Sequence, residues 1–126
     1  MAKKEYALKN ILLVAALFFA TLIPVSQAQA AASFIISPAT MAVSPGSQFT
    51  VSVVMNSDQA VNAAQGTIIF PTDRLQVTQV SKTGSILQFW SQEPSFSNAN
   101  GTISFSGGLP SPGFIGSNGV ILRVTF

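Results

Sequence analysis

Segments in which apolar and polar residues alternate, separated by glycine and proline, fill the chain after residue 30. The stretch 49–56 shows the pattern most clearly, with Phe49, Val51, Val53 and Met55 at every second position. A period of two places these side chains on one face of a strand that is buried on that face alone. After residue 30, no segment spaces its apolar residues as a helix would over three turns. The sequence therefore predicts an all-β fold.

Further strands with the same period follow along the chain. In 61–70 the apolar face takes every second residue from Ala64 to Phe70, and Gly66 within it indicates a bulge or a close backbone approach. Because the period is two, the residues between them should face solvent. Other strands are predicted at 34–36, 75–80, near Phe96, at 102–106 and at 120–126.

Turn-forming residues divide these strands. Pro45-Gly46 is typical of a tight turn, and a second turn is expected at 56–58. Asn100-Gly101 predicts a hairpin with a type I′ turn, because both residues tolerate positive φ. The density of glycine and proline in 107–119 predicts a long loop.

Short, closely spaced strands of this kind favour an antiparallel β-sandwich with one core. Because the chain ends inside the apolar strand 120–126, we expect the sandwich to lack its final strands; the alternative is a short natural edge there. The residues predicted to share the core are Phe49, Val53, Ile68, Phe70, Leu75, Ile103, Phe105, Leu122 and Val124.

The first 30 residues have the organisation of a secretory signal peptide. Lysines precede an uncharged run, 11–23, which is followed by Pro24 and the small-residue site Ala28-Gln29-Ala30. The run is too short to span a bilayer, and Pro24 argues against the alternative of an uncleaved membrane anchor. We therefore expect cleavage between Ala30 and Ala31, a mature domain at 31–126, and an extracellular or cell-surface location. The membrane is then involved only through export.

The mature part has few ionisable residues, and it has no histidine or cysteine. Its acidic and basic side chains balance in number, which argues against nucleic acid as a partner. Nucleophilic systems built on His or Cys, and nitrogen or sulfur metal sites, are excluded by composition. Hydrolysis by paired carboxylates is formally open, because it needs only two acids, but Asp58, Asp73 and Glu93 are the whole supply in the mature part and none lies in a recognisable motif. We therefore expect no enzyme activity, no metal and no cofactor. The charged residues are Asp58, Asp73, Glu93, Arg74, Lys82 and Arg123.

Four aromatic residues fall within a short stretch and suggest one kind of binding. Exposed rings stack against sugars while neighbouring amides bond the hydroxyl groups, and Trp90 is the candidate for stacking carbohydrate. The alternative is that these rings supply buried area to a small core. The aromatic residues are Phe89, Trp90, Phe96 and Phe114, and the nearby amides are Gln88, Gln92 and Asn98.

Three motifs follow one another along the mature chain. The first, 43–53, is a Pro-Gly turn leading into a valine-rich strand. The second, 66–80, places Phe70 before a turn with proline and aspartate and then an apolar strand, and the third, 119–126, is a strand that begins with glycine and ends in phenylalanine. In order and spacing these motifs resemble a cohesin domain over nearly all of the mature chain.

The resemblance implies a nine-stranded jelly-roll sandwich, related to the carbohydrate-binding modules of cellulosomal scaffolds, whose one sheet face binds dockerin modules. Cohesins are non-catalytic. The chain departs from the family at Ala63 and Gln65, where members often carry acidic or amide residues that contact dockerin, and at 71–73, where the usual Asp-Pro order is reversed. A dockerin is excluded, because its paired Asp-rich calcium loops are absent.

The outward residues Gln65, Thr67, Thr102 and Ser104 are the predicted partner-binding face. The partner expected for it is a dockerin-type protein or a polysaccharide. The same residues are equally typical of ordinary solvated strand surface. A second hypothesis is therefore a structural module of a larger surface or adhesion protein, without a ligand of its own.

The export hypothesis predicts that the secreted protein starts at Ala31, because Ala28 and Ala30 present small side chains to the peptidase. N-terminal sequencing of secreted material measures this directly. A start before residue 25, or an intact N-terminus retained in the membrane fraction, would contradict the hypothesis.

Overall fold

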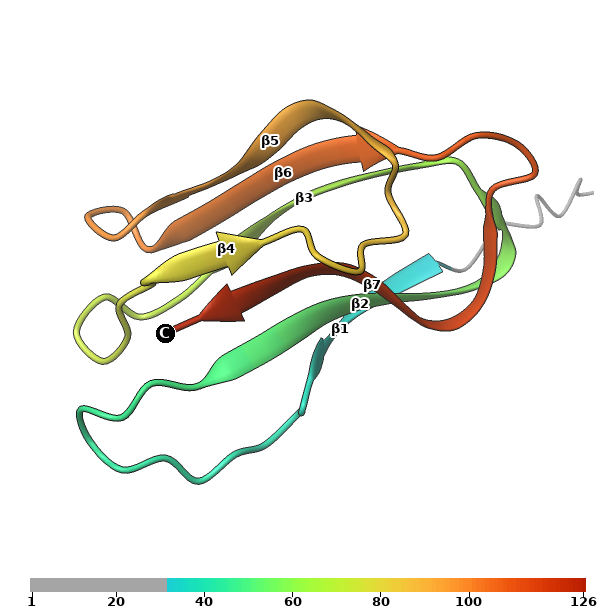
Figure 1. Cartoon of the computed structure of the whole chain (residues 1–126). Coiled ribbons are helices and arrows are strands. Elements are labelled where there is room, and N and C mark those ends of the chain that lie inside the picture. Colours follow the sequence, from blue (N-terminus) through green and yellow to red (C-terminus); the bar gives the residue numbers. More distant parts are fainter. Residues whose placement is uncertain (1–31) are drawn as a thin grey trace, which may run out of the picture.

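The computed structural model describes residues 32–126, so the predicted signal peptide and its cleavage site lie outside the described residues. Everything regular in the described part is β-structure (Figure 1). The strands are β1 (Ala32–Ser37), β2 (Thr50–Val61), β3 (Ala63–Ile69), β4 (Gln79–Ser81), β5 (Phe89–Ser97), β6 (Thr102–Gly108) and β7 (Phe114–Thr125).

The strands form two antiparallel sheets that lie face to face, as Figure 1 shows. The larger sheet has the order β1-β2-β7-β4, and the smaller has the order β3-β6-β5. Apolar side chains from both inner faces make one buried cluster between the sheets. The prediction of an all-β, antiparallel sandwich is confirmed.

The alternation predicted for 61–70 is confirmed residue by residue. Ala64 and Phe70 are buried and Ile68 packs against the core, whereas Gln65 and Thr67 are exposed. Gly66 marks a close approach and no bulge: a Cβ atom there would lie 3.3 Å from the Phe105 ring, and the β3–β6 register is unbroken.

The predicted core is confirmed, with one residue at its margin. Val53, Phe70 and six other residues of the prediction are buried or pack against the buried cluster. Phe49 is half-buried at the end of the sandwich, where its ring stacks on that of Phe126 at 5.5 Å. Phe126 in turn meets Phe70 edge-on at 5.5 Å, which links Phe49 to the core.

The long loop predicted at 107–119 is wrong, because β6 continues to Gly108 and β7 begins at Phe114. The glycines of this stretch make room for aromatic rings on strands. A Cβ atom at Gly108 would lie 2.4 Å from Cζ of Phe89, and one at Gly119 would lie 2.5 Å from Cζ of Phe114. Glycine is present here because the neighbouring strands pack closely. A count of glycine and proline residues alone predicts a loop instead.

The turn predicted at 56–58 is also wrong, because β2 runs through it to Val61. The register between β2 and β7 shifts around Ser57, and polar side chains serve the irregular backbone there. The Ser57 hydroxyl donates to the Gln59 carbonyl at 2.7 Å, and Asn56 Oδ1 accepts from the Asn118 N–H at 2.7 Å. These turn-favouring residues therefore stabilise β-bulges.

A second bulge explains why Ile121 is buried although the simple alternation of 120–126 points it outward. Val53 pairs with Leu122 and Val54 pairs with Val120, so Ile121 is the extra residue in β7. Both Ile121 and Leu122 are fully buried. Simple alternation gives the wrong orientation for Ile121, because the extra residue of a bulge interrupts the period of two.

The strand predicted at 75–80 reduces to Gln79–Ser81, and Val77 lies in the preceding loop. The backbone N–H and carbonyl of Val77 are nevertheless both hydrogen-bonded, as they would be beside a neighbouring strand. Its N–H donates to Asn98 Oδ1 at 2.8 Å, and its carbonyl accepts from Asn98 Nδ2 at 2.9 Å. Asn98 is thus engaged with the backbone.

The hairpin between β5 and β6 exists, but its turn is not type I′. Ser97 pairs with Thr102, so four residues form the loop, and of these only Gly101 has positive φ, at 64°. A side chain at Gly101 would collide with the Phe70 carbonyl oxygen, 2.4 Å from the Cβ position. Tertiary contact with Phe70 therefore requires glycine here.

Replacing Phe70 with alanine should lower the free energy of unfolding by about 3 to 5 kcal/mol, because it leaves a cavity beside Phe126 in the core of a small domain. Thermal and urea denaturation of the purified protein measure the change. A variant that melts within a degree or two of the parent would contradict the inward placement of Phe70.

Candidate binding face

The four residues predicted to bind a partner lie together on the outer face of the smaller sheet. Thr67 pairs with Ser104 across β3 and β6, and Gln65 pairs with Ser106. Thr102 precedes Ser104 by one full period on β6, so it has the same orientation. We call the surface made by Gln65, Thr67, Thr102, Ser104 and Ser106 the outer polar face.

Hydroxyl groups on this face are paired across the strands. Thr67 Oγ1 lies 3.2 Å from Ser104 Oγ, and Ser106 Oγ lies 2.8 Å from Ser91 Oγ on β5. Each hydroxyl retains further hydrogen-bonding capacity, since it can donate once and accept twice. The face is therefore a preformed row of neutral donors and acceptors.

A shallow polar hollow of about 280 Å³ lies in the middle of the outer polar face. It is open to solvent on an otherwise flat sheet surface, and its wall on the β5 side is Gln92. The residues that line it are Gln65, Gly66, Thr67, Gln92, Ser104, Phe105 and Ser106.

Ser106 belongs to this face and Ser91 adjoins it, although the sequence prediction included neither. Ser106 could have been found by extending the period of two from Ser104. Ser91 could not, because the register between β5 and β6 shifts between Trp90 and Gln92 and brings both Ser91 and Gln92 beside Ser106. That bulge has no signature in the residue types.

Two apolar side chains flank the outer polar face and were also missed. Ile69 pairs with Thr102 and is 80% exposed. At the other end Phe89 pairs with Gly108 and is 57% exposed, with its ring over the glycine. An exposed isoleucine and phenylalanine at opposite ends of a polar row provide apolar area that a partner could bury.

Trp90, the candidate for stacking carbohydrate, is placed on the other side of its strand. It pairs with Gly107, packs against the core, and its Cε3 lies 3.2 Å from where a Gly107 Cβ would be. Lys82 Nζ lies 5.6 Å from the centre of the indole ring and also forms a salt bridge with Glu93. This placement agrees with the alternative that Trp90 is a core residue.

The other aromatic residues do not extend a stacking surface from Phe89. Phe96 pairs with the buried Ile103, so it lies on the inner side of the sheet edge although it is 43% exposed, and Phe114 packs against the core. Among the described residues, Phe89 is thus the one ring of the predicted four that stands on the outer face.

Charged and metal-binding groups are sparse in the described part of the chain. Within residues 32–126, no three side chains of His, Cys, Asp or Glu come together as a metal site would require. Residues 32–126 also contain no helix that could cross a lipid bilayer. The outer polar face itself offers neutral hydrogen-bonding groups, with exposed apolar area at its two ends.

Comparison of the chain with protein-family models, with curated proteins and with solved structures finds no match. The resemblance to cohesin domains therefore continues to depend on the three motifs and their spacing.

Replacing Trp90 with alanine should destabilise the domain by about 3 kcal/mol, because its ring packs against the core. Replacing Phe89 with alanine should cost about 1 kcal/mol or less, since most of that side chain is exposed. Thermal denaturation of the two variants compares them directly. Equal melting points for Trp90→Ala and the parent would show that the indole does not contribute to packing.

Proposed function

We propose that this protein is an exported, non-catalytic binding module that acts outside the cell or at its surface, and that its outer polar face docks a protein partner of the dockerin type. The observation that carries the proposal is the convergence of Gln65, Thr67, Thr102 and Ser104 on two adjacent strands beside the exposed Ile69. A flat, neutral surface with an apolar residue at its margin suits a protein interface.

The residue chemistry favours a protein over a polysaccharide as the partner. Sugar recognition by stacking uses exposed aromatic rings, and of the predicted rings only Phe89 stands on the outer face. Protein interfaces combine apolar contacts with about one hydrogen bond per 100 to 200 Å², a mixture that the hydroxyl row and Ile69 together provide. Polysaccharide binding is accordingly the alternative that the experiment below distinguishes.

The resemblance to cohesin domains supports the same face. The positions at which members of that family contact dockerin correspond to Ala63 and Gln65, and both lie exposed on β3. The jelly-roll connection of the strands is part of this proposal. Alanine at position 63 removes a polar contact of the family, so the partner is expected to differ from the usual dockerins in what it presents there.

The second candidate function is that of a structural module without a ligand. The observation in its favour is that the hydroxyl groups of the outer polar face already bond one another, as Thr67 and Ser104 do. A solvated strand surface has the same appearance, so binding measurements decide between the two functions.

The double variant Gln65→Lys/Thr67→Lys should abolish partner binding and leave the melting temperature nearly unchanged. Both residues are exposed, so the lysines remain solvated in the free protein but would be desolvated without a counter-charge in a complex. The matched control is Gln76→Lys/Gln79→Lys, which adds the same charge at exposed positions 76 and 79, away from β3 and β6. Calorimetric titration with a panel of dockerin modules and a cellulose pull-down provide the measurements.

Loss of dockerin binding in the first double variant but not in the control is the expected result. Retention on cellulose that is lost on replacing Phe89 would instead assign the face to polysaccharide. Should the parent bind neither class of ligand, the structural-module function takes precedence and the docking proposal is wrong.

A further inference from the structure

The two sheets of the sandwich are unequal in width, with four strands facing three. On one side the edges of the two sheets lie together. There β4 packs beside β5, and the salt bridge between Lys82 and Glu93 links the two sheets. On the opposite side β1 and β3 are the two edges. Among the described strands, β1 therefore has no strand of the smaller sheet opposite it.

The inward-facing side chains of β1 are only partly covered as a result, although the Phe34 ring meets the ring of Phe105 from β6 edge-on at 6.0 Å. Phe34 and Ile36 pair with Met55 and Val53 of β2. Met55 and Val53 are 1% and 2% exposed, whereas Phe34 and Ile36 are 47% and 39% exposed. Inward-facing residues are thus fully buried on β2 but nearly half exposed on the adjacent strand β1. The part of the larger sheet that lacks a covering strand is therefore at β1.

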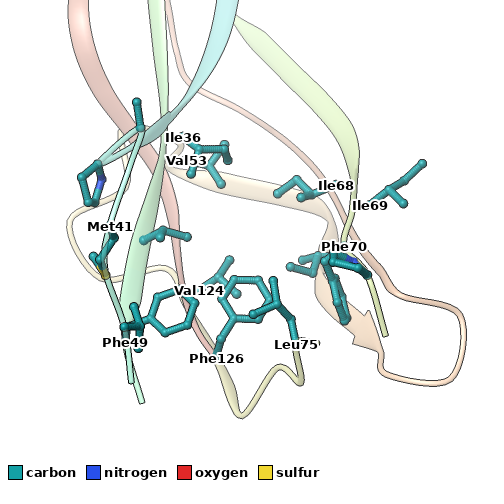
Figure 2. Close-up of a pocket in the computed structure, with 16 residues that line it drawn as sticks. Ile36, Met41, Phe49, Val53, Ile68, Ile69, Phe70, Leu75, Val124 and Phe126 are labelled. Carbon is teal, nitrogen blue, oxygen red and sulfur yellow. The ribbon is translucent and has the colours of Figure 1, made fainter. Parts of the chain in front are cut away.

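An apolar groove of about 320 Å³ runs along this side of the sandwich (Figure 2). Ile36 and Met41 form one wall, and Ile68 and Phe70 form the other. Met41 is 46% exposed, so the groove is open to solvent. None of the sixteen described residues that line it is charged.

The edge of β3 beside the groove can pair with another strand. Its seven residues pair without interruption with β6, and no described strand pairs with its other edge. The segment Ala63–Ile69 contains no proline, lysine or bulge, which are the usual devices that protect an edge strand. Its outward backbone N–H and C=O groups are free to bond an extended chain.

We propose that this groove is an acceptor site for an extended, uncharged polypeptide segment that pairs with β3 as a fourth strand of the smaller sheet. A strand is the one element that satisfies the free backbone groups of an edge while directing every second side chain into the groove. Those side chains would cover Ile36 and Met41, which line the groove. Pairing with β1 instead would leave these residues uncovered, because the new strand would extend their own sheet.

The chemistry of the occupant follows from the lining. An entirely apolar and uncharged groove excludes charged side chains at the inward positions, since nothing there would compensate their desolvation. Apolar residues at alternate positions, as in Val-Thr repeats, fit the requirement. The site differs from the outer polar face, which uses the outward side chains of β3 and its neighbours; Ile69, at the margin of that face, is the residue that also lines the groove.

A synthetic peptide tests the site directly. It has seven alternating valine and threonine residues, as many as β3 has, followed by two lysines for solubility. We expect saturable one-to-one binding to the purified protein in fluorescence anisotropy, a raised melting temperature, and slower hydrogen exchange of the β3 amides. A peptide with serine in place of every valine should not bind.

Backbone methylation tests whether the peptide binds as a strand. In an antiparallel pair the N–H groups of alternate residues point to the same edge. Methylating the nitrogens of either the valines or the threonines should therefore abolish binding in one series and leave it intact in the other. Equal binding of both methylated peptides would overturn the proposal.

The variant Met41→Glu tests the groove, because it places a charge at an exposed lining position without removing buried packing. Peptide affinity should fall by about tenfold or more. The matched control is Ile115→Glu, at a residue that is also exposed and lies outside the groove, and its affinity should stay within about twofold of the parent.

Three further outcomes would overturn the proposal. The first is absence of peptide binding, and the second is protection of the β1 amides instead of those of β3. The third is a dimer in sedimentation velocity that Met41→Glu dissociates, because a second copy of the chain would then be the occupant. The Gln65→Lys/Thr67→Lys variant should retain peptide binding, which separates failure of this site from failure of the outer polar face.

Discussion

The antiparallel ladder between β2 and β7 is the interaction on which the rest of the sandwich depends. These are the two longest strands, and they lie side by side in the middle of the larger sheet. Backbone pairing beyond the strands, between Phe49 and Phe126, continues the ladder to the end of the chain. Except for Ile103, the largest fully buried side chains all come from it, namely Met55, Val53, Ile121, Leu122 and Val124. A slip of one residue in this register would turn the apolar face outward.

The bulges in this ladder determine how the rest of the sandwich packs against it. The extra residue Ile121 lets β7 bury two consecutive side chains, and the irregular pairing around Ser57 lets β2 continue toward β3 without a separate turn. The smaller sheet then packs on the face so formed, through Ile103 and Phe105. Because the smaller sheet has one strand fewer, full burial ends at β2 and the inner face of β1 stays open.

The two proposed surfaces follow from one strand, β3, and use different parts of it. Its outward side chains, Gln65 and Thr67, belong to the outer polar face, where recognition depends on side-chain hydroxyl and amide groups. Its free edge belongs to the groove, where recognition depends on backbone groups and on apolar side chains at alternate positions. A strand that added to β3 would also widen the outer polar face. The two sites are therefore physically adjacent and share Ile69, which stands at the margin of the outer polar face and also lines the groove, although their tests are separate.

The sequence alone determined the fold class, the inward residues of β3 and β6, and the grouping of Gln65, Thr67, Thr102 and Ser104. It could do so because side chains that alternate with a period of two share a face of the strand. Tertiary structure decided the rest. The bulges at Ile121 and Ser91, the inward placement of Trp90, and the strand character of Gly108 and Gly119 depend on neighbours far away in the chain. The apolar groove is of the same kind: no local pattern shows that four strands face three, since the width of a sheet is settled only by pairing between distant segments.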